Sequence, residues 1–441
     1  MNAAAVPARP ARRRTELGLI VLAVILTGGL YALAGFGKAD SLPANIGPFL
    51  GVILGLLLIA HLAMRRFAPN ADPILLPTAG LLNGIGYVFI ARLSNHQAGL
   101  QAVWTGIGIA AFIATLAIVR RARDLERSRY TFAVLGIGAL LLPLVPHLGR
   151  NINGARLWIR LGPLNFQPGE LAKLALAIFF ASVMVERAEL LTHGTRRLGR
   201  FLVLDPKYLA PILLAWGLSL MIFLAENDLG SSFLFFTLFI AMLWVATGRT
   251  YYLGLGAGLF GVGAFFSLRV IGHARSRVQA WLDPWSHANG SGYQIIQGWY
   301  AIAAGGVYGE GPGQSNASVI PEASTDFVFA VIADELGLIG AAALLMGFLL
   351  MVGSGLRIAL RYDRPFEKLL ATGLSVVLGV QAFVIVGGIT RLIPLTGITL
   401  PFVSYGGSSL IANYILLAIL LRISHDTETP PVPPGDLTVA A

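Results

Sequence analysis

Twelve long apolar stretches run along this 441-residue chain, each bounded by charged residues or by Gly and Pro. About 20 consecutive apolar residues are enough for a helix to cross the hydrocarbon core of a bilayer. Charged residues make up only 12% of the chain, whereas a soluble domain carries about 25%. This pattern excludes an ordinary soluble enzyme and predicts an all-α polytopic membrane protein with about twelve transmembrane helices. The stretches are 17–36, 44–64, 74–93, 100–119, 130–148, 169–186, 208–225, 230–247, 251–271, 329–353, 367–389 and 399–422.

Several kinds of chemistry are excluded by what the sequence lacks. The chain has no Cys, so disulfides, thiolate zinc sites and cysteine nucleophiles are not expected. It also lacks a Walker loop and the His-Glu-x-x-His and Gly-x-Ser-x-Gly motifs, which argues against nucleotide-driven transport, zinc proteolysis and serine-hydrolase chemistry. The net charge of +10 is better explained segment by segment than by nucleic acid, and no nucleic-acid partner is expected.

Positive charge is distributed unevenly between the two sets of loops. If the N-terminus is inside, the inside loops hold sixteen Lys and Arg and the outside loops seven. Because short cytoplasmic loops carry the excess of Lys and Arg, both termini are expected to be cytoplasmic and the long loop 272–328 extracytoplasmic. Residues 1–15 are predicted to be a basic cytoplasmic tail. Residues 425–441 are predicted to be a disordered cytoplasmic tail.

Most of the outside cations lie in two loops, 149–168 and 272–328. The second loop is rich in Trp and Tyr, which favour the membrane–water interface, and 293–304 is predicted to form a short helix there. The basic residues suit an anionic ligand such as a lipid-linked diphosphate. The alternative is that these arginines only anchor helix ends to lipid phosphates.

Ionisable residues also occur near or inside the apolar stretches, where they are expensive and therefore functional candidates. Glu170 and Lys173 are three residues apart, so they can pair on one helical face. Asp228 occupies a tight outer turn together with Glu226. Asp334 and Glu335 are predicted to lie two turns into a helix that opens at 324–326 and is capped by Ser324 or Thr325. The alternative role for all of these groups is to fasten helices by hydrogen bonds.

Five motifs in order resemble the RodA/FtsW/SpoVE (SEDS) family. They are NGARLWIRLGPLNFQPGELAKL (153–174), ENDLGSS (226–232), DPW and GSGYQIIQ (within 283–297), STDFVFAVIADELGLIG (324–340) and RLIPLTGITLPFVSYGGSSLI (391–411). The resemblance implies a ten-helix SEDS core, here residues 67–424. The two stretches within 16–66 are then an additional N-terminal helix pair.

The resemblance also implies an activity. Family members are inverting peptidoglycan glycosyltransferases that polymerise lipid II at the outer face of the bacterial cytoplasmic membrane, in cell elongation or division. The growing undecaprenyl-diphosphate-linked glycan is the donor, and a class B penicillin-binding protein is the usual partner. Membrane lipid is the other expected contact. Two alternatives remain open: a scaffold for a penicillin-binding protein that has lost activity, and a flippase for lipid-linked precursors.

Site residues follow from the resemblance, with one departure. The family's catalytic Asp position is occupied by His287, and Asp283 matches a different position of the pattern. Either residue is a candidate for the catalytic role, and the departure is the reason for the scaffold alternative. The residues expected to bind substrate are Arg156, Lys173, Arg277, Thr325, Asp326, Ser404 and Gly406. Structural polar roles are expected for Glu170, Asp228, Asp334 and Glu335. No metal ligand is assigned, although a divalent cation (Mg or Mn) is a candidate cofactor for the diphosphate.

Overall fold

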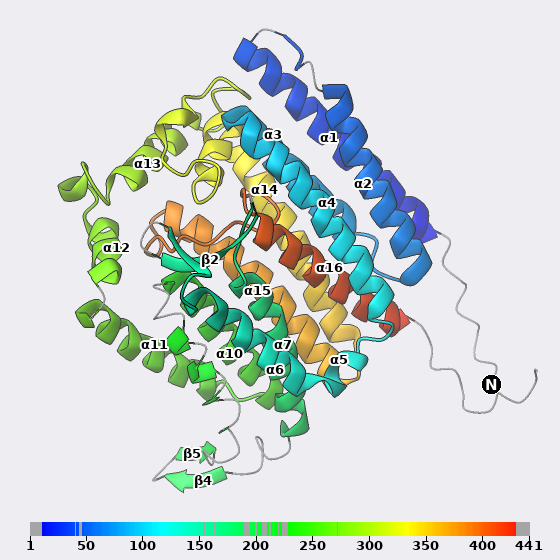
Figure 1. Ribbon diagram of the computed structural model, residues 1–441, viewed down its shortest axis with the longest axis vertical. Coiled ribbons are helices and arrows are strands. Elements are labelled where there is room, and N and C mark those ends of the chain that lie inside the picture. The colour runs from blue at the N-terminus through cyan, green and yellow to red at the C-terminus, as the bar shows by residue number, and fades with distance from the viewer. Residues whose placement is uncertain are drawn as a thin grey trace, which may run out of the picture.

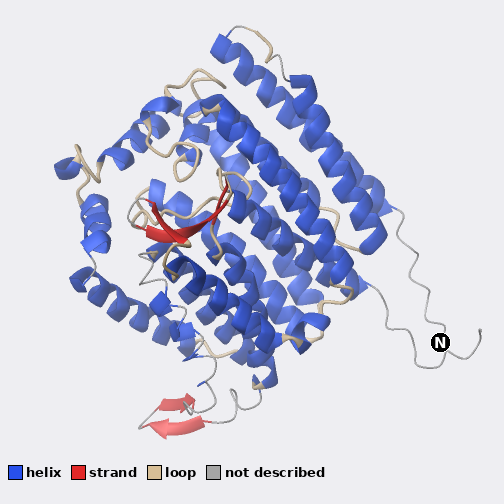
Figure 2. Cartoon of the chain, in the orientation of Figure 1, coloured by secondary structure: helices blue, strands red, loops and turns tan. Residues whose placement is uncertain are grey.

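The computed structural model describes residues 11–39, 41–43, 46–152, 155–162, 164–188, 195–198, 201–204, 210, 213–214, 216–218, 220–222, 228–270 and 272–428. Within these residues, eight helices are long and apolar enough to cross a membrane. Two shorter apolar helices, Arg129–Leu144 and Tyr251–Phe265, lie at two further predicted spans. The chain is therefore a mostly helical, multi-pass membrane protein, and Figure 2 shows how little of it is strand.

Eleven of the predicted spans coincide with helices of the described residues. These helices are α1 (Ala11–Ala39), α2 (Ile46–Phe67), α3 (Leu75–Leu93), α4 (Asn95–Ile118), α6 (Arg129–Leu141), α7 (Gly169–Glu186), α10 (Leu229–Thr247), α11 (Tyr251–Val270), α14 (Val328–Arg361), α15 (Pro365–Ile389) and α16 (Gly407–Glu428). Half of the residues of the twelfth predicted span, 208–225, and Glu226 lie outside the described residues. The count of twelve and the orientation of the termini therefore stay predictions.

Helices extend into both of the predicted tails. Helix α1 begins at Ala11, inside the predicted tail 1–15, and α16 continues to Glu428, inside the predicted tail 425–441. Residues 1–10 and 429–441 lie outside the described residues. The short helix α5 (Asp124–Arg127) joins α4 to α6.

The most buried helices form the centre of the bundle. Helix α16 packs against α4, α7, α14 and α15, while α15 packs against α7, α10 and α14. The N-terminal pair α1 and α2 lies on the flank of the bundle, against α3 and α4 (Figure 1). Their outer faces expose apolar side chains such as Ile25 and Leu62, which is stable when lipid is the solvent.

The C-terminal end of α16 ties together two loops at its end of the bundle. Arg422 donates hydrogen bonds to the carbonyls of Phe67 (2.6 Å) and Leu116. Asp426 accepts from the amide of Ala122 at 2.8 Å, and Ser424 Oγ accepts from the amide of Asp72 at 3.0 Å. The last helix of the chain is therefore buried along its length and anchored at its end.

The fold is mostly helical, as predicted, and two small antiparallel sheets add to it. Loop 149–168 forms an antiparallel sheet of β1 (Gly149–Ile152), β2 (Ala155–Leu161) and β3 (Leu164–Phe166), and β4 (Thr195–Leu198) pairs with β5 (Phe201–Leu204). The turn between β2 and β3 uses Gly162, whose φ of 62° is a conformation that Gly adopts at little cost. Hairpins pair the backbone polar groups of a loop with one another, which the helix-based prediction did not consider.

The long loop 272–328 is structured, as predicted. It contains α12 (Gly272–Leu282), a short 3₁₀ turn at Trp285–His287, α13 (Tyr293–Gly305) and a second 3₁₀ turn at Ala317–Val319. Helix α13 confirms the short helix predicted at 293–304. In Figure 1, α11, α12 and α13 follow one another in an arc along one side of the molecule.

The predicted start of α14 was wrong by several residues. The helix begins at Val328 after Phe327 and has no side-chain cap. The reason is that the preceding carbonyls are bonded elsewhere: Tyr405 N donates to the Ser324 carbonyl at 2.8 Å, and Ser404 Oγ donates to the Thr325 carbonyl at 2.6 Å. Residues 321–327 are therefore held as a turn against the segment before α16.

A buried ion pair fixes another outer segment to α14. Glu335 Oε1 lies 2.6 Å from Arg92 Nε of α3, and Glu335 Oε2 accepts from the amide of Gly313 at 2.6 Å. Ser315 Oγ also donates to Glu335 Oε1 at 3.1 Å. Helix α14 then breaks at Gly337, where φ is 65°. Glu335 therefore fastens helix and loop together, which is the structural role expected for it.

Candidate functional site

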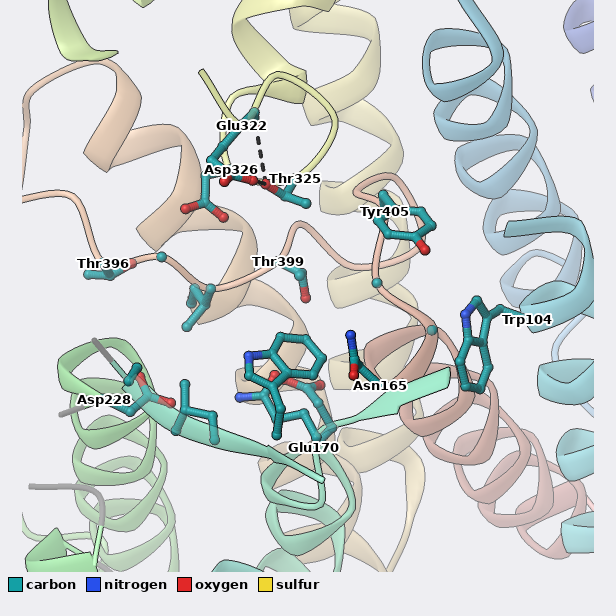
Figure 3. A pocket seen from close by; sticks show the side chains of 18 of the residues that line it. Trp104, Asn165, Glu170, Asp228, Glu322, Thr325, Asp326, Thr396, Thr399 and Tyr405 are labelled. Carbon is teal, nitrogen blue, oxygen red and sulfur yellow. Dashed lines mark hydrogen bonds between the residues drawn. The ribbon is translucent and has the colours of Figure 1, made fainter. Parts of the chain in front are cut away.

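A polar cavity of about 520 Å³ opens among the elements at the end of the bundle that carries β1–β3 and the loop 272–328 (Figure 3). Its wall is formed by the helices α4, α7, α12 and α16, the residue Asp228 that precedes α10, the strands β2 and β3, the turn 321–327 and the segment 391–406. The residues that line it are His96, Leu100, Trp104, Ala155, Leu157, Trp158, Asn165, Gln167, Glu170, Asp228, Arg277, Glu322, Thr325, Asp326, Thr396, Gly397, Ile398, Thr399, Tyr405, Gly406 and Gly407.

The segment 391–406 crosses the cavity as irregular backbone, so the helix of the span predicted at 399–422 begins eight residues later than predicted, at Gly407. Pro394 and Pro401 lack an amide donor, and Gly397 has a φ of 77°. Non-helical backbone near a membrane is tolerated where it is buried in protein or lines a cavity. This segment does both: Ser404 is buried, whereas Thr396, Gly397 and Gly406 line the cavity.

Arg277 is the arginine that lines the cavity. It comes from α12 and donates to the carbonyls of Thr396 (2.5 Å) and Leu395 (3.4 Å). These bonds hold the guanidinium beside Gly397, where an added Cβ would lie 3.3 Å from Arg277 Nη2 and 3.6 Å from Asp326 Oδ2. Glycine at 397 therefore allows the guanidinium and a carboxylate to approach the same stretch of backbone.

Asp326 and Glu322 bring two carboxylates to one wall of the cavity. Thr325 Oγ1 donates to Glu322 Oε2 at 3.1 Å, as the dashed line in Figure 3 shows, while the carboxylate of Asp326 carries no such bond there. Burial, followed by repulsion from Glu322, raises the pKa of Asp326 to about 7, although Arg277 partly opposes the shift. Asp326 thus combines a half-buried carboxylate with a pKa near neutral pH.

Two more acidic residues lie on the opposite wall (Figure 3). Asp228 caps α10 by accepting from the amide of Ser231 at 2.9 Å. Burial raises its pKa above the ordinary value, with hydrogen bonds from Ser231 opposing the shift. Glu170 lies 2.7 Å from Lys173 Nζ in a buried pair, so the predicted pairing is confirmed. Lys173 itself is not among the residues that line the cavity.

Neutral polar groups complete the lining. Asn165 and Gln167 carry amides, and Thr399 and Tyr405 carry hydroxyls, all of which suit the hydroxyl groups of a sugar. Trp104 and Trp158 add flat apolar surface. Gly407 makes room for Trp104, since a Cβ at that position would lie 2.1 Å from the indole ring. The cavity therefore offers polar, aromatic and charged surfaces together, as a glycosyl substrate requires.

The two candidate catalytic residues, Asp283 just before the 3₁₀ turn and His287 at its end, lie outside the cavity lining, and Asp283 is exposed whereas His287 is half-buried. Asp283 accepts from Ser286 Oγ at 2.5 Å and from Ser286 N at 3.2 Å. These bonds lower the pKa of Asp283 below its ordinary value. His287 Nδ1 lies 3.0 Å from the carbonyl of Asp283. The turn thus joins these two residues to each other, and neither is a lining residue.

The other predicted site residues divide into two groups. Arg277, Thr325, Asp326 and Gly406 line the cavity. Arg156 instead donates to the carbonyl of Val145 at 3.4 Å. Ser404 holds the cavity wall together through the bond to Thr325 and by accepting from the amide of Leu400 at 2.9 Å. The buried Asp334 neighbours Glu335 on α14, away from the lining.

The described residues do not fit a divalent cation. Among them, no group of three or more His, Asp or Glu side chains is arranged to hold a metal ion. The lining carboxylates form two pairs on opposite walls, Glu322 with Asp326 on one and Asp228 with Glu170 on the other (Figure 3). We therefore derive no step through a metal.

The sequence analysis missed several lining residues. Glu322, His96 and Trp104 lie outside the positions that it singled out, and Asn165, Gln167 and Thr399 lie inside quoted motifs without an assigned role. For Glu322 a signal existed, since it lies four residues before Asp326 and next to Pro321 in a predicted outer loop. His96 and Trp104 carry no such local signal, because α4 meets the cavity only in three dimensions.

Comparison with known proteins identifies the family to which this sequence is similar. The family model described as "Cell cycle protein" (FTSW_RODA_SPOVE) matches residues 74–429. The chain is 41% identical to peptidoglycan glycosyltransferase RodA of Mycobacterium tuberculosis, over 97% of this chain and 93% of that protein. It is 36% identical to a probable peptidoglycan glycosyltransferase FtsW of Geobacter metallireducens, over 78% of this chain and 87% of that protein.

Solved structures show the same fold. One chain of a solved peptidoglycan synthase complex superposes on this chain with a TM-score of 0.67 at 28% identity. That complex is described as coordinating polymerization and crosslinking. The match covers 82% of this chain and 99% of that one. The rod shape determining protein RodA of Thermus thermophilus superposes with a TM-score of 0.59 at 28% identity, over 82% of this chain and 98% of that one.

Proposed function

Because this chain belongs to the RodA/FtsW/SpoVE family, we propose that it is a peptidoglycan glycosyltransferase. The observation that carries the proposal is its 41% identity, over nearly the whole chain, to a protein named for that activity. The polar cavity supports it, since one site offers an arginine, carboxylates, amides and aromatic rings. The chain polymerises lipid II into glycan strands at the outer face of the bacterial cytoplasmic membrane, in cell elongation or division.

The arrangement of the cavity suits this reaction. Glycosyl transfer needs a group that accepts the proton of the attacking hydroxyl and positive charge near the departing diphosphate. Arg277 supplies fixed positive charge at the cavity wall, where bonds to two carbonyls keep its guanidinium in place. Amide and hydroxyl side chains of the lining orient the sugar. The lipid tails of both substrates remain in the bilayer that surrounds the helices.

A penicillin-binding protein is the proposed partner. A structural relative is part of a peptidoglycan synthase complex that couples polymerization to crosslinking, and crosslinking is the reaction that a class B penicillin-binding protein performs. The exposed apolar faces of the outer helices are available to a partner's transmembrane helix as well as to lipid.

The test is a polymerisation assay with labelled lipid II. The full-length chain, co-purified with a class B penicillin-binding protein, should make glycan polymer that resists moenomycin. A chain that binds the partner but makes no polymer is a scaffold, and the position of His287 and Asp283 outside the cavity lining is the reason to include that outcome. Movement of lipid II across a vesicle membrane without polymer would identify a flippase.

A further inference from the structure

We propose that Asp326 is the general base of this chain: its carboxylate takes the proton from the acceptor sugar hydroxyl inside the cavity. This inference rests on the glycosyltransferase function proposed above. It differs from the assignment to His287 or Asp283 that the family resemblance implies.

Position separates Asp326 from the other candidates. Asp326 is a lining residue, and it lies in a turn whose backbone is bonded to the segment 391–406 through Ser404 and Tyr405. The turn that carries Asp326 is therefore fixed to a segment that is far away in the chain. Asp283 and His287 lie on an exposed turn whose side chains are bonded within the turn itself. A general base must reach the proton that it accepts.

Hydrogen bonding leaves Asp326 available. The other acids of the lining already serve structural roles: Glu170 is paired with Lys173, Asp228 caps α10, and Glu322 accepts from Thr325. Arg277 is bonded to two carbonyls, and its guanidinium approaches Asp326 across Gly397. This arrangement lets Arg277 stabilise the carboxylate form without tying it up in a short ion pair.

Electrostatics tune the carboxylate toward neutral pH. Burial and the neighbouring Glu322 raise the pKa of Asp326 to about 7, whereas hydrogen bonds from Ser286 lower that of Asp283. A base works best when its pKa lies near the working pH, so Asp326 is the stronger base of the two. The titratable and charged groups that line the cavity together with Asp326 are Glu322, Arg277, Asp228, Glu170, His96 and Tyr405.

The proposed step is a single inverting displacement. The acceptor hydroxyl gives its proton to the carboxylate of Asp326 as its oxygen forms a bond to the anomeric carbon of the donor. The bond from that carbon to the diphosphate oxygen breaks, and its electron pair leaves with the diphosphate. Asp326 ends protonated and returns the proton to water, while the positive charge of Arg277 offsets the charge of the leaving group.

Four variants test the assignment in the lipid II polymerisation assay with the co-purified partner. Asp326→Asn should lower kcat by about 100-fold or more, the usual contribution of a general base. The KM for lipid II should stay within about threefold, because the amide keeps the shape of the side chain. Asp326→Glu should retain more activity than Asp326→Asn because it keeps a carboxylate. Asp363→Asn, an exposed Asp in the loop between α14 and α15, is the matched control and should behave as wild type.

The fourth variant tests the role of Asp326 as the base without replacing Asp326 itself. Glu322→Gln keeps an acceptor for Thr325 and removes the negative charge that raises the pKa of Asp326, so the acidic limb of the pH–rate profile should move to lower pH. A purely structural role for Asp326 gives no such shift. The variant therefore keeps the inference testable even if Asp326→Asn does not fold.

The outcomes separate the two proposals. A wild-type complex that makes no polymer contradicts the proposed function and this inference with it. An active wild type with an equally active Asp326→Asn variant overturns the inference and leaves the function standing. The same holds if His287→Ala abolishes activity while Asp326→Asn and the pH profile of Glu322→Gln match wild type, since the base would then be His287.

Discussion

Replacing Glu335 by Ala should destabilise the protein strongly, because it removes a carboxylate that several donors share. The side chain of Glu335 is 0% exposed and that of its partner Arg92 is 9% exposed. Glu335 also accepts from the amide of Gly313 and the hydroxyl of Ser315. The Ala variant leaves a buried guanidinium without its counter-charge and a backbone amide without its acceptor.

The expected magnitude follows from these contacts. Breaking a buried ion pair by removing one partner costs about 3–5 kcal/mol, and an orphaned buried donor costs about 1–3 kcal/mol. The two costs share the same desolvated site and do not simply add, so we expect about 4 kcal/mol for Glu335→Ala. Glu335→Gln should cost less, because its amide oxygen can still accept from Gly313.

The assay is thermal unfolding of the purified protein in detergent, followed by the intrinsic fluorescence of its seven Trp residues. Glu335→Ala should melt well below wild type. The double variant Arg92→Met with Glu335→Leu should recover most of the loss, because it leaves no buried charge unpaired. A Glu335→Ala protein that melts within about 2 °C of wild type, or a double variant that melts below the single one, would refute this reasoning.

Three further predictions concern the cavity, the topology and the response to pH. Arg277→Ala should lower lipid II turnover per molecule, because it removes the guanidinium from the cavity wall. The control Arg275→Ala removes an exposed arginine of the same helix and should leave turnover near wild type. Equal effects of the two variants would contradict a role for Arg277 in the cavity. A single Cys introduced at Ser291 should react with an impermeant thiol reagent from outside intact cells. No other thiol competes, because the chain has no Cys of its own. Labelling only from the cytoplasmic side would reverse the predicted orientation. Burial raises the pKa of Asp326 from 3.8 to about 7, so between these values the native state keeps a proton that the unfolded chain has released. The Asp326 carboxyl therefore lowers stability as the pH rises through this range, and Asp326→Asn should melt higher than wild type at about pH 8 but not at about pH 4; equal differences at both pH values would argue against the raised pKa.

The sequence predicts the features that depend on local spacing. Apolar length marks the helices, because a bilayer admits few other solutions. The three-residue spacing of Glu170 and Lys173 predicts their pairing, and the aromatic pattern after Gly292 predicts α13. Each of these features is contained within one turn or one helix.

Features that depend on distant segments were not predictable in this way. Arg92 and Glu335 meet only after α3 and α14 pack, and the sequence analysis assigned Arg92 no role. A motif match also covers a whole stretch without showing which side chains face the cavity. This is why Arg156 and Ser404 were grouped with Arg277, although Arg156 bonds to Val145 and Ser404 braces the backbone.

Helix α16 has a consequence for how the protein is made. It is the last helix of the described residues in chain order, yet it is packed against five earlier helices (α3, α4, α7, α14 and α15) and bonded through Arg422 to the ends of α2 and α4. Earlier helices insert while the chain is still being synthesised. The surfaces that α16 later covers are therefore exposed until α16 itself has inserted. The bundle can therefore be completed only after translation has passed residue 428, where α16 ends.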